Sequence, residues 1–282
     1  MDASSLATWL ERIPLWALGP LLLLTLFAAA LAGWRLRRRR DSTATVETAA
    51  GGDGHEGYIV SAVLGLLALL TGFTFSLAID RYETRRERVL VEANAIGTTY
   101  LRAQLLEEPH RARISRMLVD YTDNRIALAK AHGKDIQPRL GANDRMLADL
   151  WTATVAAYPT IRSYDFSSAF LDSMNALIDM DAARKAARYA RVPMEVFLVL
   201  LIYMLISAGV LGYVLVGRNG RISAAFLLFL FSLSVLLIMD VNRPNAGGIN
   251  ESQEPMIALR QTMRAQPPAL FDRFSRPADE AP

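Results

Sequence analysis

Apolar residues along the 282-residue chain gather in four long runs that are separated by polar stretches. The runs cover residues 14–34, 58–80, 194–216 and 222–241. Each is mostly apolar over about 20 residues, which is the length that an α-helix needs to cross a bilayer. Only the short segment GRNGR separates the last two runs. The pattern therefore predicts four transmembrane helices, the last two of which form an antiparallel hairpin.

The second apolar run passes into a charged segment without any turn signal between them. From Asp80 the sequence continues as DRYETRRERVLVEANAIGTTYLRAQLLEE, in which apolar residues recur at helical spacing as far as Tyr100. No proline interrupts this stretch before Pro109. We therefore predict one helix from Tyr58 to about Glu108, roughly 75 Å long at about 1.5 Å per residue. Its first part would lie in lipid and its second part in water.

The polar stretch that follows this long helix is also helical by its pattern. Helical spacing predicts one helix from about Pro109, a second over 144–158 that Pro159 ends, and a third over 164–191. The segment 133–144, GKDIQPRLGAND, is predicted to be a loop from its glycines, its proline and its Asp and Asn residues. Alternation of period two never persists, so we expect no strands.

Together these elements predict an all-α fold with four transmembrane helices and an extramembrane helical domain, into which the second transmembrane helix continues. A short amphipathic helix is expected at 250–264, followed from Gln266 by a proline-rich, disordered tail. In chain order the predicted parts are the N-terminus with the first transmembrane helix (1–34), a basic and glycine-rich linker (35–57), the second transmembrane helix (58–80), the helical domain (81–193), the hairpin (194–241) and the C-terminal segment (242–282).

Composition agrees with an integral membrane protein and excludes several kinds of chemistry. Hydrophobic residues make up 52% of the chain, and their bunching differs from the even spread of a soluble domain. The absence of cysteine excludes disulfides, thiolate metal sites and thiol catalysis. The three histidines lie in linkers or polar segments, and nothing resembles a nucleophile, base and oxyanion site, so we expect no metal, no cofactor and no enzymatic activity. The net charge of +3 comes largely from the arginine run at 35–40 and indicates no nucleic-acid partner.

The second transmembrane helix carries small residues along one face. Spacings of three and four place them on the same side of the helix: Ser61, Gly65, Ala68, Gly72 and Ser76. Asp80 extends this face into water. One interpretation is close helix packing, because small residues let membrane helices approach each other. The other is a pore-facing stripe with a carboxylate ring at its mouth, and a symmetric oligomer can satisfy both.

Charged residues mark the ends of the apolar runs. Asp80 and Arg81 follow the second run, and Asp240 and Arg243 lie at the end of the fourth. A carboxylate at such a boundary is most often solvated. The mixed acidic and basic segment 80–92 is likewise typical of a solvated helix face, where each ion pair contributes about a few tenths of a kcal/mol.

The segment TGFTFSLAIDRY at 71–82 resembles the second transmembrane segment of bestrophin channels, where a Gly-Phe pair precedes an apolar run that ends in Arg and an aromatic residue. Three further features resemble the bestrophin-like family of bacterial multi-pass membrane proteins. They are the arginine run after the first helix, the sequence EANAIGTTYLRAQLL after the second, and DVNRPNAGGINES after the fourth. This resemblance covers about residues 20–260.

The resemblance implies a homo-oligomer in the bacterial inner membrane, pentameric by analogy, that conducts inorganic ions through a pore lined by the second helix. Bestrophin pores narrow at bulky apolar residues spaced four apart, which places the constriction of this chain at Phe73 and Leu69. Gly65 departs from that pattern, since a bulky apolar residue is expected there. The acidic cluster of calcium-gated bestrophins is also missing, so we expect no calcium site. The pore candidates are then Leu69, Gly72, Phe73, Ser76 and Asp80.

Two arguments give opposite orientations in the membrane. Arginines in short loops mark the cytoplasmic side, and the run at 35–40 with the pair Arg218 and Arg221 would place the 81–191 domain outside. The resemblance to bestrophins implies that this domain is cytoplasmic. Arginines also flank the domain itself, so the sequence leaves the orientation open.

A second hypothesis for function comes from the same long helix. A helix that joins lipid to water could transmit a signal, and the chain would then be a non-conducting scaffold or sensor that acts through its helical domain. No receiver or catalytic module follows the fourth transmembrane helix. The sequence therefore favours a channel-like protein and keeps the scaffold as the alternative.

Overall fold

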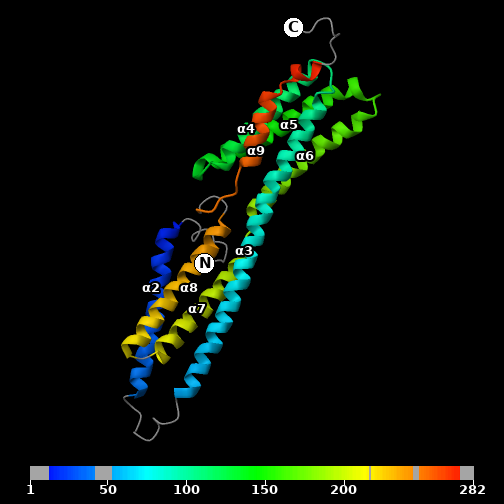
Figure 1. Ribbon diagram of the computed structural model, residues 1–282. Coiled ribbons are helices and arrows are strands. Elements are labelled where there is room, and N and C mark those ends of the chain that lie inside the picture. The colour runs from blue at the N-terminus through cyan, green and yellow to red at the C-terminus, as the bar shows by residue number, and fades with distance from the viewer. Residues whose placement is uncertain (1–12, 42–52, 216, 244–247, 274–282) are drawn as a thin grey trace. The chain divides into compact units, whose positions relative to one another are not determined.

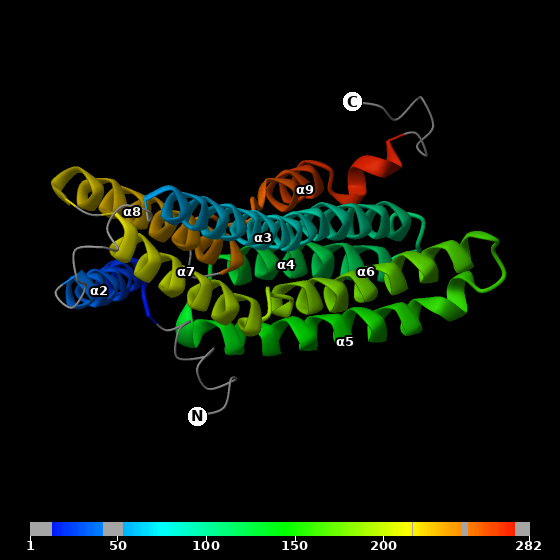
Figure 2. The same cartoon turned by 90° about the horizontal axis from the view of Figure 1, so that it is seen from below.

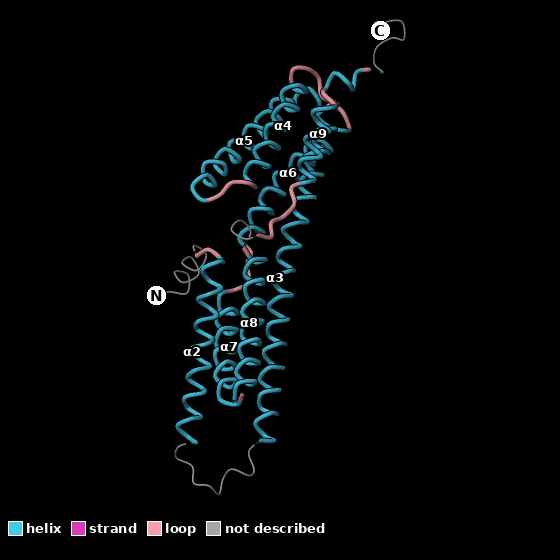
Figure 3. The backbone as a smooth tube through the Cα atoms, turned by 60° about the vertical axis from the view of Figure 1, so that its left-hand side comes forward, coloured by secondary structure: helices cyan, strands magenta, loops and turns pink. Residues whose placement is uncertain are grey.

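The computed structural model describes residues 13–41, 53–215, 217–243 and 248–273 (Figure 1). Within these ranges every regular element is a helix, as the tube in Figure 3 shows. The prediction of an all-α fold is confirmed. In chain order the elements are α2 (Leu15–Asp41), α3 (Asp53–Ala103), α4 (His110–Ala129), η2 (Gly133–Asp135), α5 (Ile136–Ile161), α6 (Phe166–Tyr189), α7 (Met194–Val214), α8 (Gly217–Asn242), α9 (Glu254–Ala265) and η3 (Pro268–Asp272).

The described helices form two compact units. The membrane unit contains α2, α7, α8 and the part of α3 up to Tyr82. The helical unit contains α3 from Glu83 together with α4, α5, α6, α9 and η3. Among the described residues, four helices are long and apolar enough to cross a membrane, namely α2, α3, α7 and α8. The long helix predicted from Tyr58 is one unbroken element, although it begins at Asp53 and ends at Ala103.

Side chains from all four helices of the membrane unit meet in its core. Its buried members include Leu26, Leu67, Leu200, Met204 and Leu228. Helices α2 and α7 pack tightly against each other at glycines. A Cβ built on Gly33 would lie 2.0 Å from the Gly209 carbonyl oxygen. A Cβ built on Gly212 would lie 1.9 Å from the Ala30 carbonyl oxygen, so this close packing requires glycine at both positions.

The arginine run at 35–40 is helical, and the prediction that a linker begins at residue 35 is wrong. Helix α2 continues to Asp41 because arginine is a good helix former and a cation is favourable in the last turn of a helix. Arg37 donates to the Tyr213 carbonyl oxygen over 3.1 Å, and so provides a donor to the C-terminal end of α7. GRNGR is also helical, since α8 begins at Gly217. The glycine-rich part of the predicted linker, 42–52, lies outside the described residues.

The helical unit is built around one apolar core. Helix α4 lies against α5 and α9, and α5 lies against α6 (Figure 2). Each helix buries one face because its apolar residues recur at helical spacing, as Ile114, Leu118 and Tyr121 do on α4. The core also holds Ile96 of α3 and Phe170 of α6, both fully buried.

The segment 133–144 was predicted to be a loop, and this prediction is wrong. After the short helix η2, α5 begins at Ile136 and includes the rest of the segment. Pro138 falls in the first turn of α5, where a backbone N–H has no partner within the helix and its loss costs little. Helix α5 also passes through Pro159 and ends at Ile161. Proline near either end of a helix is therefore a weaker stop signal than the sequence suggested.

The amphipathic helix expected at 250–264 is present as α9, but the tail after it is ordered further than predicted. Helix η3 follows at Pro268–Asp272. Arg111 of α4 makes a two-point contact with Asp272, with Nη1 2.6 Å from Oδ1 and Nη2 2.9 Å from Oδ2. The Tyr100 hydroxyl donates to the Gln266 carbonyl oxygen over 2.7 Å. These bonds hold the segment on the helical unit as far as the described residues reach, and 274–282 lie outside them.

Candidate pore face of helix α3

The residues that the sequence singled out lie on the face of α3 that is turned away from the other helices of the membrane unit. All of them are exposed: Ser61, Gly65, Ala68, Leu69, Gly72, Phe73, Ser76 and Asp80. Leu67, Thr74 and Ala78 are buried instead. At about 100° per residue, the centres of the two sets lie on opposite sides of the helix. One face of α3 thus packs within the protomer and the other is presented outward.

The two glycines of the exposed face make no close contact within the described chain. A Cβ added at Gly65 or at Gly72 would meet no described heavy atom within 4 Å. This differs sharply from Gly33 and Gly212, where a Cβ would collide with a neighbouring backbone. The small residues of α3 therefore do not serve close packing inside one protomer, and the packing interpretation would require a second copy of the chain.

Two bulky apolar residues stand among these small ones. Leu69 is 55% exposed and Phe73 is 63% exposed, although both are large and apolar. They are four residues apart and so lie on neighbouring turns of the same face. Gly65, one turn further toward the N-terminus of α3, has no side chain to add to them. The outward face therefore carries bulky side chains on two successive turns and none on the turn of Gly65.

The charged residues that follow Ser76 on α3 differ in their exposure to solvent, although the sequence predicted that all of them are solvated. Asp80 is exposed and Arg81 is half-buried. Glu83 and Arg86 form an exposed ion pair of 3.4 Å, which contributes little to stability because solvent screens it. Arg85, in contrast, is buried and paired with Glu251. The prediction that the whole segment 80–92 is a solvated face is therefore wrong.

The other two boundary residues tie the chain together at the end of α8. An Asp240 carboxylate oxygen accepts the Gly248 backbone N–H over 2.6 Å, so Asp240 is more than a solvated carboxylate. Arg243 is 7% exposed and its Nη1 donates to the Ile13 carbonyl oxygen over 2.9 Å. Between them, the Asn242 side-chain oxygen accepts the Val192 N–H over 3.0 Å. This end of α8 is thereby bonded to the chain just before α2 and just before α7.

The helical unit contains a cluster of buried charges that was not predicted from the sequence. Glu92 of α3 is fully buried and binds two arginines, Arg125 of α4 and Arg184 of α6. The Tyr121 hydroxyl also donates to Glu92 over 2.9 Å. Arg125 continues to Asp181 of α6, with 3.1 Å between Nη1 and Oδ1. A signal was available, because Glu92 lies at helical spacing among the apolar residues of α3 rather than on its polar side.

Asn143 and Asp144 of α5 and Lys185 of α6 complete this cluster. Asn143, which is fully buried, donates from Nδ2 to Asp181 over 2.9 Å. Lys185 binds both Asp181, over 2.7 Å, and the more exposed Asp144. The network contains three carboxylates and three cations, so its charges balance. Side chains from α3, α4, α5 and α6 are joined in one network.

The electrostatics of the cluster favour its charged form. Burial raises the pKa of the Tyr121 hydroxyl, and the adjacent Glu92 carboxylate raises it further, so Tyr121 stays a neutral donor. Burial alone would lower the pKa of Arg125, but Glu92 and Asp181 outweigh it and the pKa is raised. The arrangement is a closed structural network. Among the described residues, no three His, Asp or Glu side chains are placed to hold a metal ion.

Four apolar helices of membrane-spanning length, joined to polar helices, define an α-helical multi-pass membrane protein. A family model described as the Bestrophin-like domain matches residues 21–256, so the chain belongs to the Bestrophin-like family. The resemblance seen in the sequence is thereby confirmed. A search of curated proteins finds no match.

Solved structures share the fold. A crystal structure of a variant of the bacterial bestrophin homologue from Klebsiella pneumoniae matches with a TM-score of 0.65 at 16% identity, covering 94% of this chain and 100% of that one. A second variant of that homologue gives 0.62 at 17% identity over 93% and 99%. The homologue phased with zinc gives 0.62 at 17% identity over 92% and 98%. At such low identity the likeness concerns the fold.

Proposed function

We propose that this protein is a homo-oligomeric ion channel of the inner (plasma) membrane, pentameric by analogy with bestrophins. The outward faces of α3 from five copies would surround a central path for inorganic ions. Phe73 and Leu69 form its constriction, and Asp80 lies at its mouth. Ser61, Gly65, Ala68, Gly72 and Ser76 line the remainder of the path or let neighbouring copies approach.

The observation that carries this proposal is the division of α3 into two faces. Leu67, Thr74 and Ala78 attach the helix to its own protomer, while the opposite face presents a stripe of small residues outward, together with Leu69 and Phe73. A lipid-facing helix gains little from such a stripe, because glycine and alanine offer little apolar surface and serine hydroxyls are disfavoured next to hydrocarbon. Water or a second copy of the chain fits this face better. Membership of the Bestrophin-like family supports the same choice.

Ion flux through liposomes that contain the purified protein tests the proposal. Phe73→Ala removes a bulky ring from the constriction and should raise the flux without changing the oligomeric state. Phe75→Ala is the matched control, since it removes the same ring about 160° around the same helix. An equal rise in both variants would contradict a constriction at Phe73.

Gly65→Leu provides a change in the opposite direction. It adds a third bulky residue on the same face, where an added Cβ would meet no described atom within 4 Å, and should lower the flux. Wild-type and variant proteins that assemble but conduct nothing would overturn the channel proposal. That result would favour the alternative of a non-conducting scaffold or sensor.

A further inference from the structure

An apolar cavity of about 370 Å³ lies between the N-terminal halves of α2 and α7, with α8 along its third side. This volume is within the range of about 300–1,000 Å³ that is usual for small-molecule sites. All three helices contribute apolar side chains to its walls, including Leu18, Leu22, Phe197, Leu201 and Met239. Along α8 the lining runs from Val235 to Asn242, which is roughly 10 Å at 1.5 Å per residue. The cavity therefore suits an elongated apolar group.

The cavity opens to the surface of the membrane unit between α2 and α7. These two helices are in tight contact toward their C-terminal ends, at Gly33 and Gly212, whereas the cavity separates their N-terminal halves. Leu21 of α2 and Leu198 of α7 line the cavity and are nonetheless 46% and 53% exposed, so they mark its mouth. Both belong to helices of membrane-spanning length and composition. The mouth therefore faces the hydrocarbon of the bilayer.

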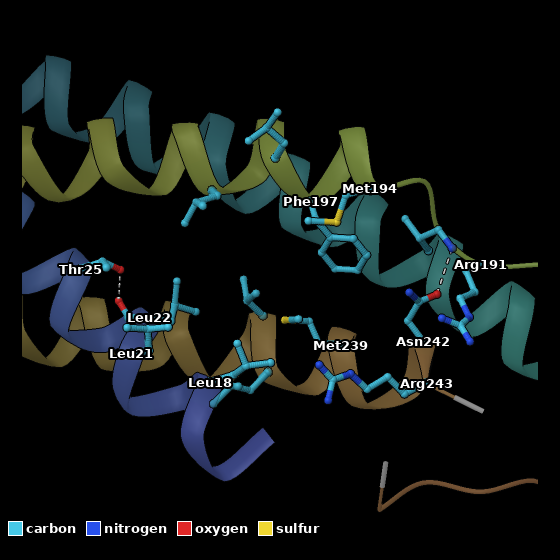
Figure 4. Close-up of a pocket in the computed structure, with 15 residues that line it drawn as sticks. Leu18, Leu21, Leu22, Thr25, Arg191, Met194, Phe197, Met239, Asn242 and Arg243 are labelled. Carbon is cyan, nitrogen blue, oxygen red and sulfur yellow. Dashed lines mark hydrogen bonds between the residues drawn. The ribbon is translucent and has the colours of Figure 1, made fainter. Parts of the chain in front are cut away.

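The polar residues of the lining already have partners within the protein. Arg191, Asn242 and Arg243 stand together at one end, while Thr25 lies toward the other (Figure 4). Asn242 and Arg243 make the hydrogen bonds that join the end of α8 to the chain just before α7 and α2. Arg191 also has an interaction partner, and the Thr25 hydroxyl donates to a carbonyl oxygen of its own helix over 2.7 Å. An occupant of this cavity therefore needs to supply no charge and no hydrogen bond.

Hydrocarbon fits these conditions better than water or another helix. Water is not retained in a cavity that offers it few polar partners, and an empty cavity forfeits the dispersion contacts of its walls. A helix with its side chains is about 10 Å across, so a 10 Å length of one occupies roughly 800 Å³, about twice the volume of the cavity. An acyl chain is narrower, and the bilayer supplies it directly at the mouth.

We propose that this cavity binds one acyl chain of a membrane lipid, whatever the headgroup of that lipid. The chain enters between Leu21 and Leu198 and lies along α8 toward Val235 and Met239. Burial of its methylene groups against the three helices supplies the affinity. The site is separate from the outward face of α3 and does not depend on ion conduction.

Photolabelling of the full-length protein in phosphatidylcholine vesicles tests the proposal. The probe is phosphatidylcholine that carries a diazirine in the middle of one acyl chain, and mass spectrometry locates the label after irradiation. Val235 is 7% exposed and lines the cavity, so lipid on the outer surface of the helices does not reach it. Label should appear at Val235 and Met239. Its absence from both residues would overturn the proposal, since the cavity would then be closed to lipid or covered by a second copy of the chain.

Two variants fill the cavity from different helices. Thr25→Trp on α2 and Leu198→Trp on α7 each place an indole ring at exposed positions of the lining, where the protein should still fold. Each should lower the labelling of Val235 and Met239 by about tenfold or more, because the ring takes the space of several methylene groups of the chain.

The matched controls are Leu24→Trp and Ile202→Trp, which lie on the same two helices and are exposed but do not line the cavity. Both should label like wild type. Labelling that stays unchanged in Thr25→Trp and in Leu198→Trp would overturn the proposal.

The headgroup distinguishes an acyl-chain site from an anion site. Phosphatidylglycerol with the same diazirine-bearing chain should label Val235 and Met239 as strongly as phosphatidylcholine does. A strong preference for phosphatidylglycerol would contradict the proposal, because it would show that the polar end of the cavity selects the ligand.

Discussion

Glu92 of α3 and Arg125 of α4 form an ion pair inside the helical unit, with 2.8 Å between Arg125 Nε and Glu92 Oε1. Their side chains are 0% and 4% exposed. Removing two charges from water is costly. The pair is stable because Tyr121 and Arg184 also bind the Glu92 carboxylate, and Asp181 also binds the Arg125 guanidinium group. The network thus fixes the positions of three helices around one carboxylate.

Glu92→Gln should destabilise the protein severely. The change leaves Arg125 and Arg184 buried without their carboxylate, and losing one partner of a buried pair costs about 3–5 kcal/mol. Thermal unfolding of the purified protein in detergent measures the effect. The exposed Glu87→Gln serves as control and should stay within about 0.5 kcal/mol of wild type. Similar melting temperatures for both variants would show that the network contributes little to stability.

Stability should depend on pH through Asp144 and Lys185. The hydrogen bond from Lys185 holds the pKa of Asp144 below its ordinary value of 3.8. A depressed pKa adds stability that is present above pH 3.8 and is lost as the pH falls through the folded-state value. Asp144→Asn should therefore be less stable than wild type at neutral pH, and the difference should vanish in strong acid.

At high pH, stability should fall as the pH rises, because Lys185 loses its proton. Burial lowers the pKa of Lys185, but hydrogen bonds to Asp144 and Asp181 outweigh it and raise the pKa above 10.5. Its contribution is complete below pH 10.5 and is lost as the pH rises through the folded-state value. Melting temperatures measured across the pH range show the loss of stability in acid and the loss in alkali. Asp149→Asn, also exposed on α5, is the control. If the melting temperatures of wild type and Asp144→Asn fall equally as the pH is lowered, Asp144 is not the source of the pH dependence.

Gly212→Ala should separate α2 from α7. The new methyl group would meet the Ala30 backbone at 1.9 Å, and no side-chain rotation can relieve a clash with backbone. Overpacking of this kind costs about 1–3 kcal/mol, which lowers the melting temperature. Gly65→Ala meets no described atom and should melt like wild type. If the two alanine variants melt alike, the close contact between these helices does not exist in the membrane protein.

Arg111→Gln should loosen the C-terminal segment on the helical unit. It breaks the two-point contact with Asp272, which is half exposed and so contributes about 1 kcal/mol, or roughly a fivefold change in opening. Hydrogen exchange of Pro268–Asp272 should accelerate accordingly, while Arg113→Gln on the exposed side of α4 should leave it unchanged. Exchange that is equally slow in both variants would mean that other contacts hold the segment.

Local patterns in the sequence predicted the architecture correctly, but not every helix boundary. The four apolar runs and the continuity of α3 followed from hydrophobic periodicity, because the burial of apolar surface acts on each helix separately. Proline and glycine misled the prediction at 133–144, where Pro138 stands in a first turn that tolerates it. The arginines at 35–40 misled it again, because Arg37 bonds to α7, far along the chain.

The sequence by itself determined that this is a four-span helical membrane protein of the Bestrophin-like family, with small residues along one face of α3. Only the tertiary structure decided that this face points outward, that Glu92 lies inside a charge network, and that Arg191 and Arg243 share one end of an apolar cavity. The physical reason is distance along the chain. Periodicity encodes which face of a helix is apolar, whereas pairing of Glu92 with Arg125 and Arg184 depends on how separate helices pack.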